Sequence, residues 1–215
     1  MANNSWKNEL TAEKKILDLL RVCLSFKKNR FNSVVLWLVF ILMIIACVAI
    51  YLSSETNEVS KVAGIITSLV PHVMTYSIGI LGFLVAGFAI LASSNTNGLF
   101  EVLAKTKHPR EKVSVFQFTF FNFIFVIIVH LGLLSFGFSV FIIAHVLAII
   151  DEINFFEVSN FIRFIINSTI LTGLIMLLCF ALLSVKSFVW NLYANLVLAT
   201  LAESASRSLN KDNKS

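Results

Sequence analysis

Charged residues divide the chain into four long uncharged runs. The runs cover residues 31–54, 62–100, 113–150 and 164–185. Each run is longer than the roughly 18 to 20 apolar residues that mark a helix crossing a lipid bilayer. The pattern therefore predicts an all-α integral membrane protein with four transmembrane helices, at about residues 33–53, 70–93, 119–147 and 164–185.

Composition supports this interpretation. Of the 215 residues, 58% are hydrophobic and only 13% are charged, whereas soluble domains carry roughly a quarter charged residues. We interpret the two longest runs, 62–100 and 113–150, as one helix each, because neither has a polar turn at its middle. A helix over 113–150 would be about 57 Å long, beyond the roughly 30 Å hydrocarbon core. Its beginning, "EKVSVFQFTFFNF", should therefore project from the bilayer.

The basic residues give the predicted orientation. Fifteen of the seventeen lysines and arginines lie before the first span, between the second and third, or after the fourth. Lys61 and Arg163 are the exceptions. Because basic residues favour the cytoplasmic side, both termini should be cytoplasmic. The predicted domains are a cytoplasmic amphipathic helix over 1–32, a four-helix transmembrane domain over 33–186, and a cytoplasmic C-terminal helix with a disordered tail over 187–215.

Two segments outside the predicted spans carry apolar residues on the predicted cytoplasmic side of the membrane. The N-terminal segment is amphipathic, and the segment after Lys186 is largely apolar. An apolar face near the N-terminus consists of Ile16, Leu17, Leu20, Cys23 and Leu24. This helix is either an interfacial anchor or a docking helix, for the protein's own cytoplasmic bundle or for a partner. After Lys186, the stretch "SFVWNLYANLVLATLAES" is too apolar for free exposure to water. It should either continue the fourth span into a cytoplasmic bundle or lie along the inner leaflet.

Small and polar residues form a stripe along the second predicted span. Steps of three and four residues join His72, Thr75, Gly79, Gly82, Ala86, Ala89 and Ser93. In lipid, small residues let helix backbones approach closely, which supplies the contact that hydrophobicity cannot. The stripe is therefore a predicted packing seam. It could face the protein's own helices, or it could face another subunit or line a pore.

Histidines are the main ionisable groups inside the predicted spans, and His72 and His130 are the candidates for a polar site. Ionisable residues within a membrane are functional candidates by default. His130 lies at mid-span, in line with Gly137 and Ala144 at steps of seven. A neutral imidazole bonded to a neighbouring helix, a proton-sensing or conducting group, and a metal ligand remain open alternatives.

Motifs for catalysis or cofactor binding do not emerge from the sequence. The predicted spans contain no aspartate or glutamate, and Cys23, Cys47 and Cys179 are widely separated. The glycines lack the lysine and strand context of a phosphate-binding loop. Positive-inside topology accounts for the pI of about 9.2, and no basic patch is interleaved with aromatic residues as in nucleic-acid sites. We therefore expect no enzyme activity, no cofactor, no metal and no direct nucleic-acid partner.

Three stretches carry a resemblance to a known family. They are the amphipathic start "ILDLLRVCLSFKKNR", the stripe "SIGILGFLVAGFAILAS" and the end of the last helix, "LATLAES". With the four-span layout, they resemble the small KwaA-like membrane subunits of the Kiwa anti-phage defence system of bacteria. The resemblance implies an oligomeric sensor in the bacterial inner (cytoplasmic) membrane, which holds a cytosolic effector and responds when a phage disturbs the envelope.

Three functions of different classes follow as hypotheses. The first is a non-enzymatic membrane scaffold or sensor that forms a homo-oligomer, dimer to tetramer, and binds a cytosolic effector protein. The alternative is an ion channel or toxic membrane pore, with the stripe or His130 facing a central axis. The third is a membrane enzyme or transporter, which would need convergent polar groups such as His130 with Asn167, Ser168 and Thr172.

Overall fold

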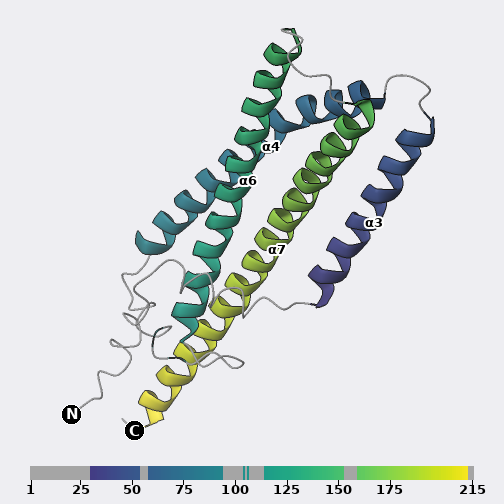
Figure 1. The fold of residues 1–215 in the computed structure, drawn as a ribbon. Coiled ribbons are helices and arrows are strands. Elements are labelled where there is room, and N and C mark those ends of the chain that lie inside the picture. The colour runs from purple at the N-terminus through teal and green to yellow at the C-terminus, as the bar shows by residue number, and fades with distance from the viewer. Residues whose placement is uncertain are drawn as a thin grey trace. The chain divides into compact units, whose positions relative to one another are not determined.

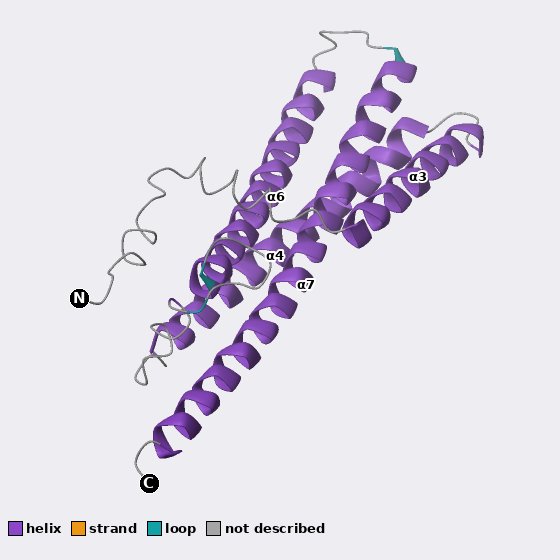
Figure 2. Ribbon diagram, turned by 90° about the horizontal axis from the view of Figure 1, so that it is seen from below, coloured by secondary structure: helices purple, strands orange, loops and turns teal. Residues whose placement is uncertain are grey.

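The computed structural model describes residues 30–53, 58–93, 104, 106, 114–152 and 159–212 (Figure 1). Helices make up nearly all of this part of the chain (Figure 2). They are α3 (Arg30–Ser53), α4 (Glu58–Ser93), α6 (Val115–Glu152) and α7 (Asn160–Asp212). The amphipathic helix predicted near the N-terminus falls on residues before Arg30, outside those described, and stays a prediction.

All four helices are long and apolar enough to cross a membrane. The qualifying stretches are Arg30–Leu52, Val59–Ala89, Val115–Val146 and Asn160–Ala194. This confirms the expectation of an all-helical chain with four helices of membrane-spanning length, as in a multi-pass membrane protein. All four helices start before the predicted spans, α4 by the most, because hydropathy marks the part of a helix that matches the lipid and not the residue where the helix begins.

Pro71 lies inside α4 and does not end it. A proline within a helix removes one backbone hydrogen bond and bends the axis. The first turns of α4 run at an angle to the rest of the helix (Figure 1). Just before the proline, the Thr67 hydroxyl lies 3.1 Å from the Ala63 carbonyl oxygen and 3.0 Å from that of Gly64. Helix α4 therefore continues through Pro71 with a change of direction.

The last helix, α7, runs without interruption over 53 residues. At 1.5 Å per residue it is about 80 Å long, more than twice the thickness of a hydrocarbon core. The stretch after Lys186 therefore continues the fourth helix, whereas the cytoplasmic bundle that it was expected to join stays a prediction. Good helix formers such as Ala202, Glu203 and Arg207 extend it to Asp212, through most of the stretch expected to form a tail.

The described residues belong to two compact units, and each of the three longer helices contributes one segment to each unit. The first, the α3 unit, contains residues 30–53, 58–82, 128–152 and 159–183 among those described. Its buried side chains come mainly from three helices, α4, α6 and α7: Val62, Ile66, Val70, Val73, Leu133, Val140, Phe164, Leu171, Leu174 and Ala181. None of the apolar window of α3 is buried. Tyr51 is its aromatic link to α7, with ring centroids 5.4 Å from Phe164 and 6.2 Å from Phe161.

The second unit contains residues 83–93, 104, 106, 114–127 and 184–212 among those described. Aromatic rings join its three helical segments. The Phe123 ring of α6 stacks on Phe88 of α4 at 5.1 Å and contacts Phe188 of α7 at 5.8 Å. Phe120 of α6 also approaches Phe88, at 6.0 Å. Such ring pairs stabilise packing beyond the area that they bury, so this cluster holds the unit together.

Candidate functional site

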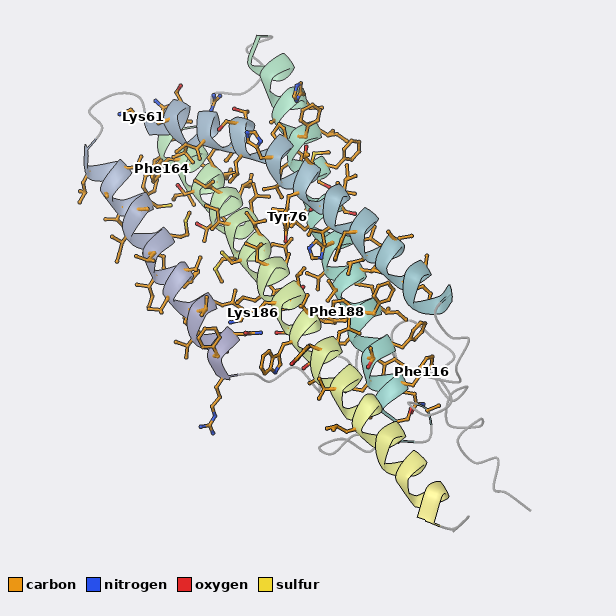
Figure 3. The ribbon with its side chains drawn as sticks, turned by 180° about the vertical axis from the view of Figure 1, so that it is seen from behind. Lys61, Tyr76, Phe116, Phe164, Lys186 and Phe188 are labelled. Carbon is orange, nitrogen blue, oxygen red and sulfur yellow. The ribbon has the colours of Figure 1, made fainter. Side chains whose placement is uncertain are left out.

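His130 and Tyr76 form a buried polar pair in the α3 unit. His130 of α6 has no solvent exposure, and its ring lies 5.7 Å from the half-buried ring of Tyr76 on α4 (Figure 3). Ser77, beside Tyr76 in sequence, is also fully buried and donates a hydrogen bond to the Val73 carbonyl at 2.9 Å. The pair places ionisable and hydroxyl groups at the contact between two membrane-length helices.

The other two membrane histidines are exposed. His72 follows Pro71 on α4, and His145 lies near the end of α6. The Nδ1 atom of His145 is 2.8 Å from the Phe141 carbonyl oxygen, and the His145 ring lies 4.2 Å from the Phe141 ring. His145 is thus bonded within its own helix. Of the two predicted polar candidates, His72 and His130, the structure buries only His130 and does not bring both into one buried site.

The polar groups predicted for a membrane enzyme lie at different levels along α7. A Cβ atom added at Gly173 of α7 would lie 3.6 Å from the Phe136 ring of α6, which sets the register of the two antiparallel helices. His130 is six residues from Phe136 and is therefore level with about residue 179. Thr172, Ser168 and Asn167 lie on the other side of Gly173, so they are about 10, 16 and 18 Å away along the axis. The register of α6 against α7 therefore keeps these polar side chains apart along the helix axes.

The small-residue stripe of α4 lies at the surface of the described chain. Thr75, Gly79, Gly82, Ala86 and Ala89 are all exposed. A Cβ atom added at Gly79 or Gly82 would meet no atom within 4 Å. The side chain of Ser93 lies outside those described. The buried face of α4 carries larger residues instead: Val62, Ile66, Val70, Val73, Ser77 and Leu84. The helix therefore packs on the rest of the described chain through that face, with the stripe turned away.

Close approach between helices occurs at other glycines. A Cβ atom at Gly137 of α6 would lie only 3.3 Å from the Met74 side chain of α4. Gly137 is buried, and it lies two turns along α6 from His130. The sequence puts both residues on one line along the helix, but it does not identify Gly137 as the point of contact. The signal was the seven-residue step, which puts the two positions on one helix face.

A capping box begins α6, and sequence analysis did not recognise it. The Ser114 hydroxyl accepts a hydrogen bond from the Gln117 amide at 3.2 Å, and the Gln117 side-chain oxygen accepts one from the Ser114 amide at 3.1 Å. This reciprocal pattern satisfies the free amides at a helix start. Both residues are buried, and the Val115 amide donates to the Thr106 carbonyl at 2.9 Å. In the sequence, the serine and glutamine three residues apart in "SVFQ" are the pattern that indicates a capping box.

Known proteins offer no assignment for this arrangement. Among the described residues, no group of three or more His, Cys, Asp or Glu side chains could hold a metal ion. What the geometry provides is the contact of buried His130 with half-buried Tyr76, one exposed small-residue helix face and one helix that is much longer than a membrane is thick. In comparisons with protein families, curated proteins and solved structures, no family model, protein or structure matched this chain.

Proposed function

We propose that this chain is a non-enzymatic scaffold and sensor of the bacterial inner membrane, which assembles with copies of itself and holds a cytosolic effector protein. The observation that carries the proposal is the exposure of the α4 stripe. Thr75, Gly79, Gly82, Ala86 and Ala89 are all at the surface of the described chain. Lipid-facing positions have no need of glycine, whereas contacts between membrane helices are rich in small residues.

The long α7 helix supports the effector-binding part of the proposal. If Lys186 marks the membrane boundary, the 26 residues from Ser187 to Asp212 extend about 39 Å beyond it. A helix of that length offers a surface to a soluble protein. Several of its side chains are exposed and apolar, including Val189, Trp190 and Tyr193. A role in phage defence follows from the resemblance to the KwaA-like subunits and is part of the same proposal.

Crosslinking of the protein in native membranes tests the self-assembly. The variant Gly82→Leu adds bulk on the stripe, at a position where an added Cβ atom would meet no other part of the described chain within 4 Å. We expect it to lower the yield of crosslinked oligomer while membrane insertion stays normal. Gly132→Leu is the matched control, because Gly132 is also exposed and its added Cβ atom also meets nothing within 4 Å. An unchanged oligomer yield in Gly82→Leu would contradict the assigned role of the stripe.

Purification in mild detergent tests the effector, and liposomes test the alternative. We expect a soluble protein to co-purify with the full-length chain, and the purified chain alone to carry no ion flux in liposomes. A steady ion flux through the purified protein would instead support the pore. Plating efficiency of phages on cells with and without the chain and its neighbouring genes tests the defence role, and equal plating would contradict it.

A further inference from the structure

Two contacts join α4 to α6 within the α3 unit. His130 of α6 is fully buried, and its ring centroid lies 5.7 Å from that of Tyr76 on α4. Two turns along α6, a Cβ atom added at buried Gly137 would lie 3.3 Å from the Met74 side chain. Met74 and Tyr76 are two residues apart on α4, so both contacts hold the same short stretch of that helix.

The surroundings of His130 offer no charge to balance a protonated imidazole. Among the described residues, the helices contain no Asp, Glu, Lys or Arg over 31–53, 62–93, 115–150 and 164–185. Tyr76 is the titratable group that faces His130 from α4. On α7, the register of Gly173 against Phe136 puts Cys179 at the same level. A phenol and a thiol are both neutral at about pH 7 and below, so neither stabilises an imidazolium.

The charge of a histidine changes between about pH 8 and pH 5. A neutral imidazole is tolerated at a buried position, whereas a buried imidazolium without a counter-charge is strongly disfavoured. We propose that His130 is a pH-sensitive switch: the α4–α6 contact is closed while its imidazole is neutral and opens when the imidazole gains a proton. The contact is therefore strongest at neutral and alkaline pH and weakens as the pH falls.

Pro71 gives α4 a place to bend when the contact opens. It lies inside the helix, three residues before Met74, and the turns that precede it run at an angle to the rest of α4 (Figure 1). A proline removes one backbone hydrogen bond and weakens the helix at that point. The stretch after Pro71 carries both Tyr76 and the exposed stripe, so a movement at Tyr76 also moves the stripe. An effect on self-assembly rests on the proposed function, whereas the opening of the contact does not.

Spin labels on α4 and α6 measure the opening within one chain. Ile78 and Gly132 are exposed residues of the α3 unit, and a Cβ atom at Gly132 would meet no described atom within 4 Å. In cysteine-free, full-length protein in lipid nanodiscs, Ile78→Cys and Gly132→Cys carry the labels, and excess unlabelled protein dilutes out pairs between copies. The distance between the labels should shift or broaden by about 2 Å from about pH 7.5 to about pH 5.5. Identical distance distributions would overturn the proposal.

Histidine variants assign the change to His130. One variant keeps His130 and combines His72→Gln, His108→Gln and His145→Gln. It leaves the buried position intact and should keep the full pH-dependent change. The matched variant His130→Gln retains the other three histidines and should lose the change, because glutamine gains no proton. Loss of the change in the first variant, or its survival in His130→Gln, would overturn the proposal. The first variant decides alone where His130→Gln does not fold.

The label distance and the yield of crosslinked oligomer separate this switch from self-assembly. A distance that depends on pH and on His130, with an oligomer yield unchanged by Gly82→Leu, would support the switch and contradict assembly through the stripe. A distance that is the same at both pH values, with a yield lowered by Gly82→Leu, would overturn the switch and leave the assembly role in place.

Discussion

The imidazole ring of His130 lies 5.7 Å from the phenol ring of Tyr76, and it is fully buried between helices. Gly137, on the same face of α6, packs against Met74, two residues before Tyr76 on α4. The α4–α6 contact in the α3 unit therefore combines a polar ring pair with a close glycine approach. Neither feature alone would specify the contact, because each type of residue is common in membrane helices.

Replacing His130 should destabilise the fold more than replacing His72. The change His130→Ala removes a fully buried ring and leaves a cavity, which typically costs about 2–4 kcal/mol. His72 is exposed, and surface changes usually stay within about 0.5 kcal/mol. Unfolding by a denaturing detergent measures both variants. Equal stability of His130→Ala and the unchanged protein would contradict the packing described for this pair.

Added bulk at Gly137 should weaken the α4–α6 contact. An added Cβ atom would already lie 3.3 Å from the Met74 side chain, so Gly137→Leu overpacks the contact and should cost about 1–3 kcal/mol. Gly132→Leu on the same helix is the control, because a Cβ atom there meets nothing within 4 Å. The midpoint of thermal unfolding in detergent compares the two. If both variants unfold at the same temperature, Gly137 is not a point of close approach.

The start of α6 should depend on its capping box. Ser114→Ala removes the hydroxyl that accepts from the Gln117 amide, and the loss of such a cap typically costs about 0.5–2 kcal/mol. Ser135→Ala is the comparison, since Ser135 is an exposed serine within α6. Amide hydrogen exchange in the first turn of α6 should accelerate in Ser114→Ala only. Unchanged exchange there would mean that the cap does not stabilise the helix start.

The distribution of basic residues predicts a membrane sidedness that can be measured directly. In a cysteine-free background, Ser159→Cys should react with an impermeant maleimide added to intact spheroplasts. Lys211→Cys, near the other end of α7, should react only after the membrane is opened, because basic residues favour the cytoplasmic side. The opposite labelling pattern would reverse the topology and place the proposed effector surface outside the cell.

Hydropathy was sufficient to predict four membrane-length helices, because a helix that crosses a bilayer needs about 20 consecutive residues that are mainly apolar. It could not predict which face of each helix packs inward, since lipid and protein interior are both apolar. The α4 stripe illustrates this: its small residues suggested a seam, yet α4 packs on the described chain through residues such as Val70 and Val73. His130 was identified as a candidate, whereas its neighbour Tyr76 was not, because the contact depends on how α4 and α6 pair.

The shallow packing of α3 has a consequence for how the protein would respond to lipid. None of its apolar window is buried, while Tyr51 holds its end against Phe161 and Phe164 of α7. Its contact with the described chain is one half-buried face, formed by Val35, Leu36, Val39, Met43 and Cys47. In a bilayer, a helix held by such a shallow contact would adjust its tilt when the hydrophobic thickness changes. We therefore expect thinning or thickening of the membrane to shift α3 before it shifts α4, α6 and α7, whose side chains supply the buried core of the α3 unit.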